Sequence, residues 1–179
     1  ARETAEESIT LLKNDNILPL SKNAKVLVCG PAANSLTLIN GAWTRTWQGT
    51  DSKYEDNSRH TIFEALQALN SNVTFSEGSA LDSLSTVDEA VAKARTSDVI
   101  VVCLSELPST EKPGDIEDLR MPDAQLELVK RLSKTGKPIV LVLVENRPRI
   151  IHDIVPLCSA VVMAYQPGDL GSDALARIL

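Results

Sequence analysis

Apolar residues follow two different spacings along this chain, and the two spacings alternate. Where apolar residues recur three and four positions apart, as in residues 61–69, they predict amphipathic helices. Where they form short unbroken runs, as in residues 138–144, they predict strands that are covered on both faces. We expect helices at residues 1–14, 61–69, 86–94, 122–133 and 171–179, and strands at 25–29, 73–75, 98–104, 138–144 and 160–164.

Two of these helices are predicted from specific residues. The helix over residues 1–14 would place Ala5, Ile9 and Leu12 on one face. The helix that starts near Thr86 has Glu89 three positions later, which is the pattern of a capping box. We therefore expect the Thr86 side chain to cap that helix.

Strands that alternate with helices of about ten residues predict right-handed crossovers and a parallel sheet between helical layers. The expected fold is α/β, a doubly wound three-layer sandwich with a mostly parallel sheet, formed as a single domain by residues 1–179. Ligands of such sheets lie beyond the carboxyl ends of the strands. The loops after Cys29, Leu104 and Val144 are therefore the places to look for a site.

Composition and charge narrow the classes of partner. The chain has 179 residues, of which 43% are apolar and 23% charged, as in ordinary globular proteins. A net charge of −6, with scattered Lys and Arg, disfavours nucleic acid. No apolar run is long enough to cross a membrane. Two histidines and three cysteines without close spacing predict no metal site and no disulfide framework.

The loop after residues 25–29 starts with Gly30-Pro31, where a dinucleotide-binding strand would carry its glycine-rich turn. That turn needs three glycines so that the backbone can approach a pyrophosphate, and Pro31 also lacks an amide hydrogen. A flavodoxin-like nucleotide-binding module is therefore disfavoured, and we expect no cofactor.

Both tryptophans lie within the polar segment 41–49, which follows the same strand. Trp43 and Trp47 have Thr, Arg, Gln and Gly as neighbours. Flat indole rings beside polar side chains can stack on the C–H faces of sugars. The alternative is that one or both rings close the open end of the core.

The loop after the strand 98–104 is rich in carboxylates, including Glu106, Glu111 and Asp115. Such a loop can supply the acid of a glycosidase, the base of another hydrolase, or only a solvated acidic surface. Ser105 has no evident histidine partner, so a serine-nucleophile triad is a poor fit.

Short motifs in a fixed order make the chain resemble the C-terminal α/β-sandwich domain of glycoside hydrolase family 3 enzymes of the β-glucosidase type. Each motif alone is weak, but their order and spacing are specific. The motifs are Glu7-Ser8-Ile9-Thr10-Leu11-Leu12-Lys13-Asn14, Leu18-Pro19-Leu20, Gly30-Pro31, Trp43-Thr44, Trp47-Gln48-Gly49, Glu111-Lys112-Pro113-Gly114-Asp115, Gly136-Lys137-Pro138, Arg147-Pro148, and Pro167-Gly168 with Gly171.

The resemblance implies a retaining β-glycosidase that acts on β-glucosides or oligosaccharides. It implies that Glu111 is the general acid/base, that Trp47 and Trp43 line the aglycone side of the pocket, and that Glu106 has a supporting structural role. The nucleophilic aspartate would come from an N-terminal TIM barrel that is absent from this chain, so the isolated fragment is expected to be inactive. By the same resemblance the enzyme is periplasmic or secreted.

The chain departs from the family pattern at three places, where Ala42, Asn146 and Ser172 replace glycines. These exchanges affect the expected detail of the loops. The alternative function is a sugar-binding or interface domain without a catalytic residue, in which Glu111 only forms hydrogen bonds with hydroxyl groups.

Overall fold

The computed structural model describes all of residues 1–179 and contains five α-helices and six strands. The helices are α1 (Arg2–Ser8), α2 (Ile62–Leu69), α3 (Val87–Thr96), α4 (Asp123–Ser133) and α5 (Gly171–Ile178). The strands are β1 (Thr10–Asn14), β2 (Val26–Cys29), β3 (Val73–Phe75), β4 (Val99–Ser105), β5 (Ile139–Val144) and β6 (Ala160–Met163).

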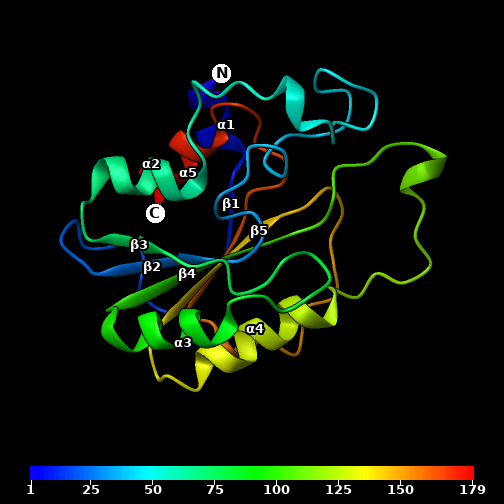
Figure 1. Ribbon diagram of the computed structural model, residues 1–179. Coiled ribbons are helices and arrows are strands. Elements are labelled where there is room, and N and C mark those ends of the chain that lie inside the picture. Colours follow the sequence, from blue (N-terminus) through cyan, green and yellow to red (C-terminus); the bar gives the residue numbers. More distant parts are fainter.

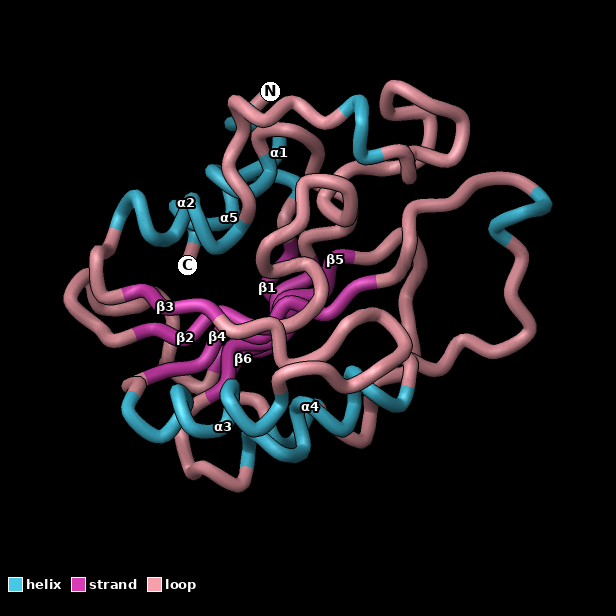
Figure 2. The backbone as a smooth tube through the Cα atoms, in the orientation of Figure 1, coloured by secondary structure: helices cyan, strands magenta, loops and turns pink.

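The six strands form one sheet in the order β1-β6-β5-β4-β2-β3, between two layers of helices. Strands β2 to β6 are parallel, and β1 alone pairs antiparallel, with β6. Helices α1, α2 and α5 cover one face, and α3 and α4 cover the other (Figures 1 and 2). The expected α/β three-layer sandwich with a mostly parallel sheet is confirmed.

Every residue of the central strands β4 and β5 is buried, because each of their faces packs against one helical layer. Alternate residues of these strands belong to the two separate cores, so Val101 contacts the α2–α5 layer and Ile100 the α3–α4 layer. The three cysteines are buried and free. Burial raises the pKa of the Cys158 thiol to about 12, and these thiols therefore act as small apolar side chains.

The prediction of a helix over residues 1–14 is wrong in its second half. Helix α1 ends at Ser8, and the backbone of Ile9 is extended. Thr10–Asn14 forms β1 instead, with Thr10 opposite Met163 in the antiparallel register. This strand satisfies the backbone groups along the edge of β6, a long-range gain that a local helical pattern does not reveal.

The predicted capping box at Thr86 is also wrong, although α3 starts where it was expected. The Thr86 hydroxyl accepts a hydrogen bond from the Gly78 amide at 3.1 Å and so serves the preceding loop. A complete capping box occurs instead at Thr61 and Glu64, where it opens α2. The capping pattern therefore occurs at both helices, and the surrounding loop decides which is used.

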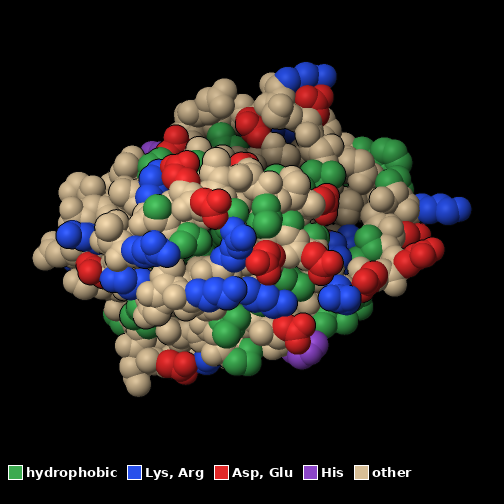
Figure 3. Space-filling view, turned by 60° about the horizontal axis from the view of Figure 1, so that its bottom comes forward, with side chains coloured by type: hydrophobic (Ala, Val, Ile, Leu, Met, Phe, Trp, Pro, Cys, Tyr) green, Lys and Arg blue, Asp and Glu red, His purple; other side chains and the backbone are tan.

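The surface over α3 and α4 mixes positive and negative side chains (Figure 3). Arg131 pairs there with Asp88 and Glu127, and Lys93 pairs with Glu89. Exposed pairs of this kind stabilise a fold by less than about 1 kcal/mol each. No helix in the structure is both long enough and apolar enough to cross a membrane.

From β2 the chain adds β3 on one side, and from β4 onward it adds strands on the other side, so the switch point of the sheet lies between β2 and β4. A doubly wound sheet has a crevice at such a point. Gly30 lies at this point with a φ of +94°, and a Cβ there would come within 2.5 Å of the Cys103 carbonyl oxygen. Only glycine fits, because the loop after β2 must turn sharply against the backbone of β4.

Candidate functional site

Loops from the carboxyl ends of β2, β4, β5 and β6 meet around one cavity of about 610 Å³. The loops after Cys29, Leu104 and Val144 are those expected from the sequence, and Figure 1 shows the first two extending from the same side of the sheet. The cavity is lined by Ala42, Trp43, Ser109, Thr110, Glu111, Gly114, Asp115, Asn146, Arg147 and Gln166. Polar side chains dominate this lining, as suits a ligand rich in hydroxyl groups.

Glu111 lines this cavity, is exposed to solvent, and has a strained backbone. Its φ is +56° and its ψ is −155°, a combination that is almost confined to glycine. A single 3-10 turn, Lys112–Gly114, follows it directly, and the Gly114 amide donates to the Glu111 carbonyl at 2.8 Å. Strain of about 1–3 kcal/mol is retained here because neighbouring contacts hold the loop, and such strain clusters at functional sites.

Two loops of the site are joined through Gln48. We call residues 41–49 the Trp loop and residues 106–120 the Glu111 loop. The Gln48 side chain donates to the Thr110 carbonyl at 3.2 Å and accepts from the Thr110 amide at 3.0 Å. Residues on either side of this contact, Trp43 and Glu111, line the same cavity.

The two tryptophans are exposed to 66% and 47% of their surface, so neither closes the core. Trp43 lines the cavity, whereas Trp47 is not part of its lining. The Trp43 amide donates to the Trp47 carbonyl at 2.9 Å, which closes the Trp loop. Gly49 completes this turn with a φ of +74°, and a Cβ there would come within 2.4 Å of the Gly41 carbonyl oxygen.

Arg147 clamps the Glu111 loop from the end of β5. Its guanidinium donates to the Gly114 carbonyl at 2.7 Å and to the Ser109 hydroxyl at 3.0 Å. These contacts lie on either side of Glu111 along the chain. The clamp is charge-assisted and bidentate, so it fixes both the distance and the orientation of the Glu111 loop relative to Arg147.

Glu106 differs from Glu111 because it is buried and both of its carboxylate oxygens bind other groups of the protein. It is 5% exposed, and its carboxylate accepts from the amides of Asn146 (2.8 Å) and Arg147 (3.0 Å). The Arg149 guanidinium binds its other oxygen at 2.8 Å. This arrangement suits a support for the β5 loop and leaves Glu106 no free face for a ligand.

Glu145 is a second buried carboxyl group in this cluster, and it is 1% exposed. Its Oε1 accepts from the Arg149 amide at 3.2 Å, while its Oε2 has no hydrogen-bond partner. Burial, which outweighs the Arg149 contacts, raises the pKa of this carboxyl to about 7, with a further contribution from the nearby Glu106 charge.

The structure thus brings Trp43 and Glu111 together, as expected from the sequence, and leaves Trp47 beside the cavity. Arg147 belongs to a sequence motif to which no role was assigned, and Gln166 was not predicted. A signal for Arg147 existed, since Arg147-Pro148 lies in the loop that follows the buried run of β5. No comparable signal marks Gln166, which enters from the loop after β6.

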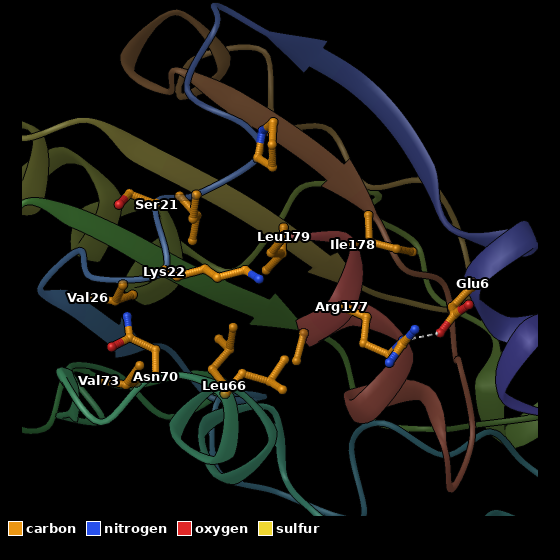
Figure 4. Close-up of a pocket in the computed structure, with 14 residues that line it drawn as sticks. Glu6, Ser21, Lys22, Val26, Leu66, Asn70, Val73, Arg177, Ile178 and Leu179 are labelled. Atoms are coloured by element: carbon orange, nitrogen blue, oxygen red, sulfur yellow. Dashed lines mark hydrogen bonds and ion pairs between the residues drawn. The ribbon is translucent and has the colours of Figure 1, made fainter.

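A second cavity of about 480 Å³ lies at the amino ends of β2 and β3, beside α2 and α5 (Figure 4). Apolar side chains such as Leu66, Val73 and Leu179 line much of it, and its Arg177 is paired with Glu6 at 3.0 Å. It lies away from the carboxyl ends of the strands. The polar cavity is therefore the better candidate site.

Comparisons with known proteins agree on one family. Residues 9–179 match the family model described as "Glycosyl hydrolase family 3 C-terminal domain". The chain is 44% identical to a lysosomal beta glucosidase of Dictyostelium discoideum, over 100% of this chain and 23% of that protein. It is 31% identical to a beta-xylosidase of Formosa agariphila, over 100% of this chain and 26% of that protein.

Solved structures show the same fold. The crystal structure of a beta-glucosidase from Listeria innocua in complex with glucose superimposes with a TM-score of 0.86 at 26% identity. The match covers 99% of this chain and 24% of that one. This chain therefore spans about a quarter of the length of the relatives it matches.

Proposed function

Since the chain belongs to the glycosyl hydrolase family 3 C-terminal domains, we propose that it provides the general acid/base of a retaining β-glucosidase. Glu111 first protonates the leaving-group oxygen and then, as a carboxylate, activates the water that releases the sugar. The observation that carries the proposal is the placement of Glu111, exposed and strained on a clamped loop that lines the polar cavity.

The geometry supports Glu111 over Glu106 for this role. An acid/base must reach the substrate oxygen, and Glu111 is exposed in the cavity while Glu106 is 5% exposed and ion-paired. Glu106 instead holds the β5 loop, whose Arg147 clamps the Glu111 loop.

A retaining mechanism needs a second carboxyl group about 5–5.5 Å from the acid/base. We propose that this nucleophile is an aspartate of an N-terminal TIM-barrel domain of the same protein, outside residues 1–179. The chain spans about a quarter of the length of its relatives, which leaves room for such a domain. The isolated chain is then expected not to hydrolyse glycosides.

The proposed substrate is a β-glucoside or an oligosaccharide with a glucose at its non-reducing end. The relative with 44% identity carries the name of a beta glucosidase, and a more distant one that of a beta-xylosidase. Trp43 provides an exposed indole face in the cavity for the leaving sugar. Trp47 remains a predicted platform, beside the cavity.

The test is the dependence of Glu111→Ala on the leaving group in the full-length enzyme. Turnover of a disaccharide should fall by about 10²–10⁴-fold, whereas first-step cleavage of a dinitrophenyl glucoside, which needs no proton, should change little. Equal losses on both substrates would favour the alternative, a domain that only binds sugar. Parallel assays with aryl xylosides test the choice of sugar.

A further inference from the structure

Two buried carboxyl groups, those of Glu106 and Glu145, bind different groups of the same residue, Arg149. The Arg149 guanidinium binds Glu106 Oε2 at 2.8 Å, and the Arg149 backbone amide donates to Glu145 Oε1 at 3.2 Å. Glu106 accepts further bonds from Arg147 and from two backbone amides. Glu145 has no other donor, and its Oε2 is buried without a partner.

We propose that Glu145 is a positioning residue for Glu111, and that it keeps the Glu111 loop in place only while its carboxyl group carries a proton. The inference rests on the proposed role of Glu111. Glu145 itself does not line the cavity, although the next residue, Asn146, does.

The effect of ionisation follows from the contacts of Glu145. The charged groups that face it are Glu106, from the loop after β4, and Arg149, from its own loop after β5. A neutral Glu145 tolerates an oxygen without a donor far better than a charged one, because an unpaired buried charge is costly. An ionised Glu145 would therefore attract the Arg149 guanidinium away from Glu106.

The effect on Glu111 follows from the contacts of Glu106. Glu106 orients Arg147 through the Arg147 amide at 3.0 Å and its Nε at 3.4 Å. Arg147 in turn holds Ser109 and Gly114, on either side of Glu111. Loss of Arg149 from Glu106 loosens this chain of contacts, and the strained backbone of Glu111 is then free to relax.

Hydrogen–deuterium exchange of the full-length enzyme tests the link to the loop. With a pKa of about 7, the protonated fraction of Glu145 falls from about 90% at pH 6 to about 10% at pH 8. After correction for intrinsic exchange, protection of residues 106–120 and of the Asn146 and Arg147 amides should fall about fivefold to tenfold over this range. In Glu145→Gln, which resembles the protonated acid, it should stay constant within about twofold.

The matched control is Glu89→Gln, which alters an exposed glutamate on α3 and should respond like the wild type. Equal protection of the wild-type loop at both pH values would overturn the inference. So would an undiminished loss of protection in Glu145→Gln.

The kinetic test uses a disaccharide, whose leaving group requires the proton that Glu111 is proposed to donate. Its kcat/KM should fall at least about threefold less between pH 6 and pH 8 in Glu145→Gln than in the wild type. Identical pH profiles would overturn the positioning role. If Glu111→Ala shows no dependence on the leaving group while the loop still responds to Glu145, the proposed function fails and the link between Glu145 and the loop stands.

Discussion

The side chain of Gln48 pairs with the backbone of Thr110 in both directions, donating to its carbonyl and accepting from its amide. The contact spans 62 positions of sequence and lies next to Glu111. It makes the Trp loop and the Glu111 loop one unit, so that an indole face and a carboxyl group keep a fixed relation across the cavity. Arg147 holds the same unit through Ser109 and Gly114.

Breaking this pair should reduce catalysis more than stability. Gln48→Leu leaves two backbone groups of Thr110 without partners at a half-buried position, which should destabilise the ordered conformation of the loop by about 1–2 kcal/mol. We expect kcat/KM of the full-length enzyme to fall about tenfold through misplacement of Glu111. Gln67→Leu, which removes one 3.5 Å bond on α2, is the control and should leave kcat/KM unchanged. Equal losses in the two variants would show that the contact has no special role.

Trp43 should determine how well leaving sugars bind. Trp43→Ala removes an indole face that is 66% exposed in the cavity, so folding should be little affected. We expect KM for a disaccharide to rise about fivefold to tenfold, from about 1–1.4 kcal/mol of lost stacking, and KM for a small aryl glucoside to change less. Trp47→Ala should have a smaller effect. A larger effect from Trp47 would place the platform beside the cavity described here.

The two glutamates of the loop should respond in opposite ways to substitution. Glu106→Ala leaves Arg149 and Arg147 without their carboxylate inside the protein and should cost about 3–5 kcal/mol of unfolding free energy. Glu111→Gly should instead stabilise the chain by about 1 kcal/mol, because glycine adopts a φ of +56° without strain. Urea unfolding of both variants, with Glu111→Ala for comparison, measures these changes. A loss of stability in Glu111→Gly would contradict the strained geometry.

Much of this geometry was predictable because apolar patterns are local. The unbroken runs of β4 and β5 showed that both faces are buried, and the parallel order then placed the site at the carboxyl ends of the strands. The residue pattern alone does not separate the exposed Glu111 from the buried Glu106, since both lie in the same acidic loop, and only the family resemblance assigned them different roles. The contacts that separate their roles come from Asn146, Arg147 and Arg149, which lie 40 to 43 positions beyond Glu106 in the sequence.

The two errors in the predicted secondary structure, at residues 10–14 and at Thr86, share one physical cause. Residues 10–14 carry a pattern that a helix could use, but the unpaired edge of β6 attracts them into a strand. Thr86 has the residue spacing of a cap, but the Gly78 amide uses its hydroxyl. In both cases a partner distant in sequence outweighs a local preference of less than about 1 kcal/mol per residue.

Stability should depend on pH through Glu145. Its pKa rises from 4.5 to about 7 on folding, so the folded chain binds a proton that the unfolded chain releases. The contribution of Glu145 to the free energy of unfolding is therefore complete below about pH 4.5 and is lost as the pH rises through 7. Glu145→Gln should be more stable than the wild type by about 1–3 kcal/mol at pH 8, with a smaller difference at pH 5. Urea unfolding at both pH values, with Glu89→Gln as control, measures this; a difference that does not depend on pH would contradict the assignment.

The most direct test of the account is azide rescue of Glu111→Ala in the full-length enzyme, on a glucoside with a leaving group that needs no proton. Azide attacks the glycosyl-enzyme without base catalysis, so it should restore turnover and give a β-glucosyl azide of retained configuration. Glu106→Ala should show no such rescue, because that carboxylate is buried and ion-paired. Rescue of Glu106→Ala but not of Glu111→Ala would transfer the acid/base role to Glu106, and rescue of neither would contradict a catalytic role for this domain.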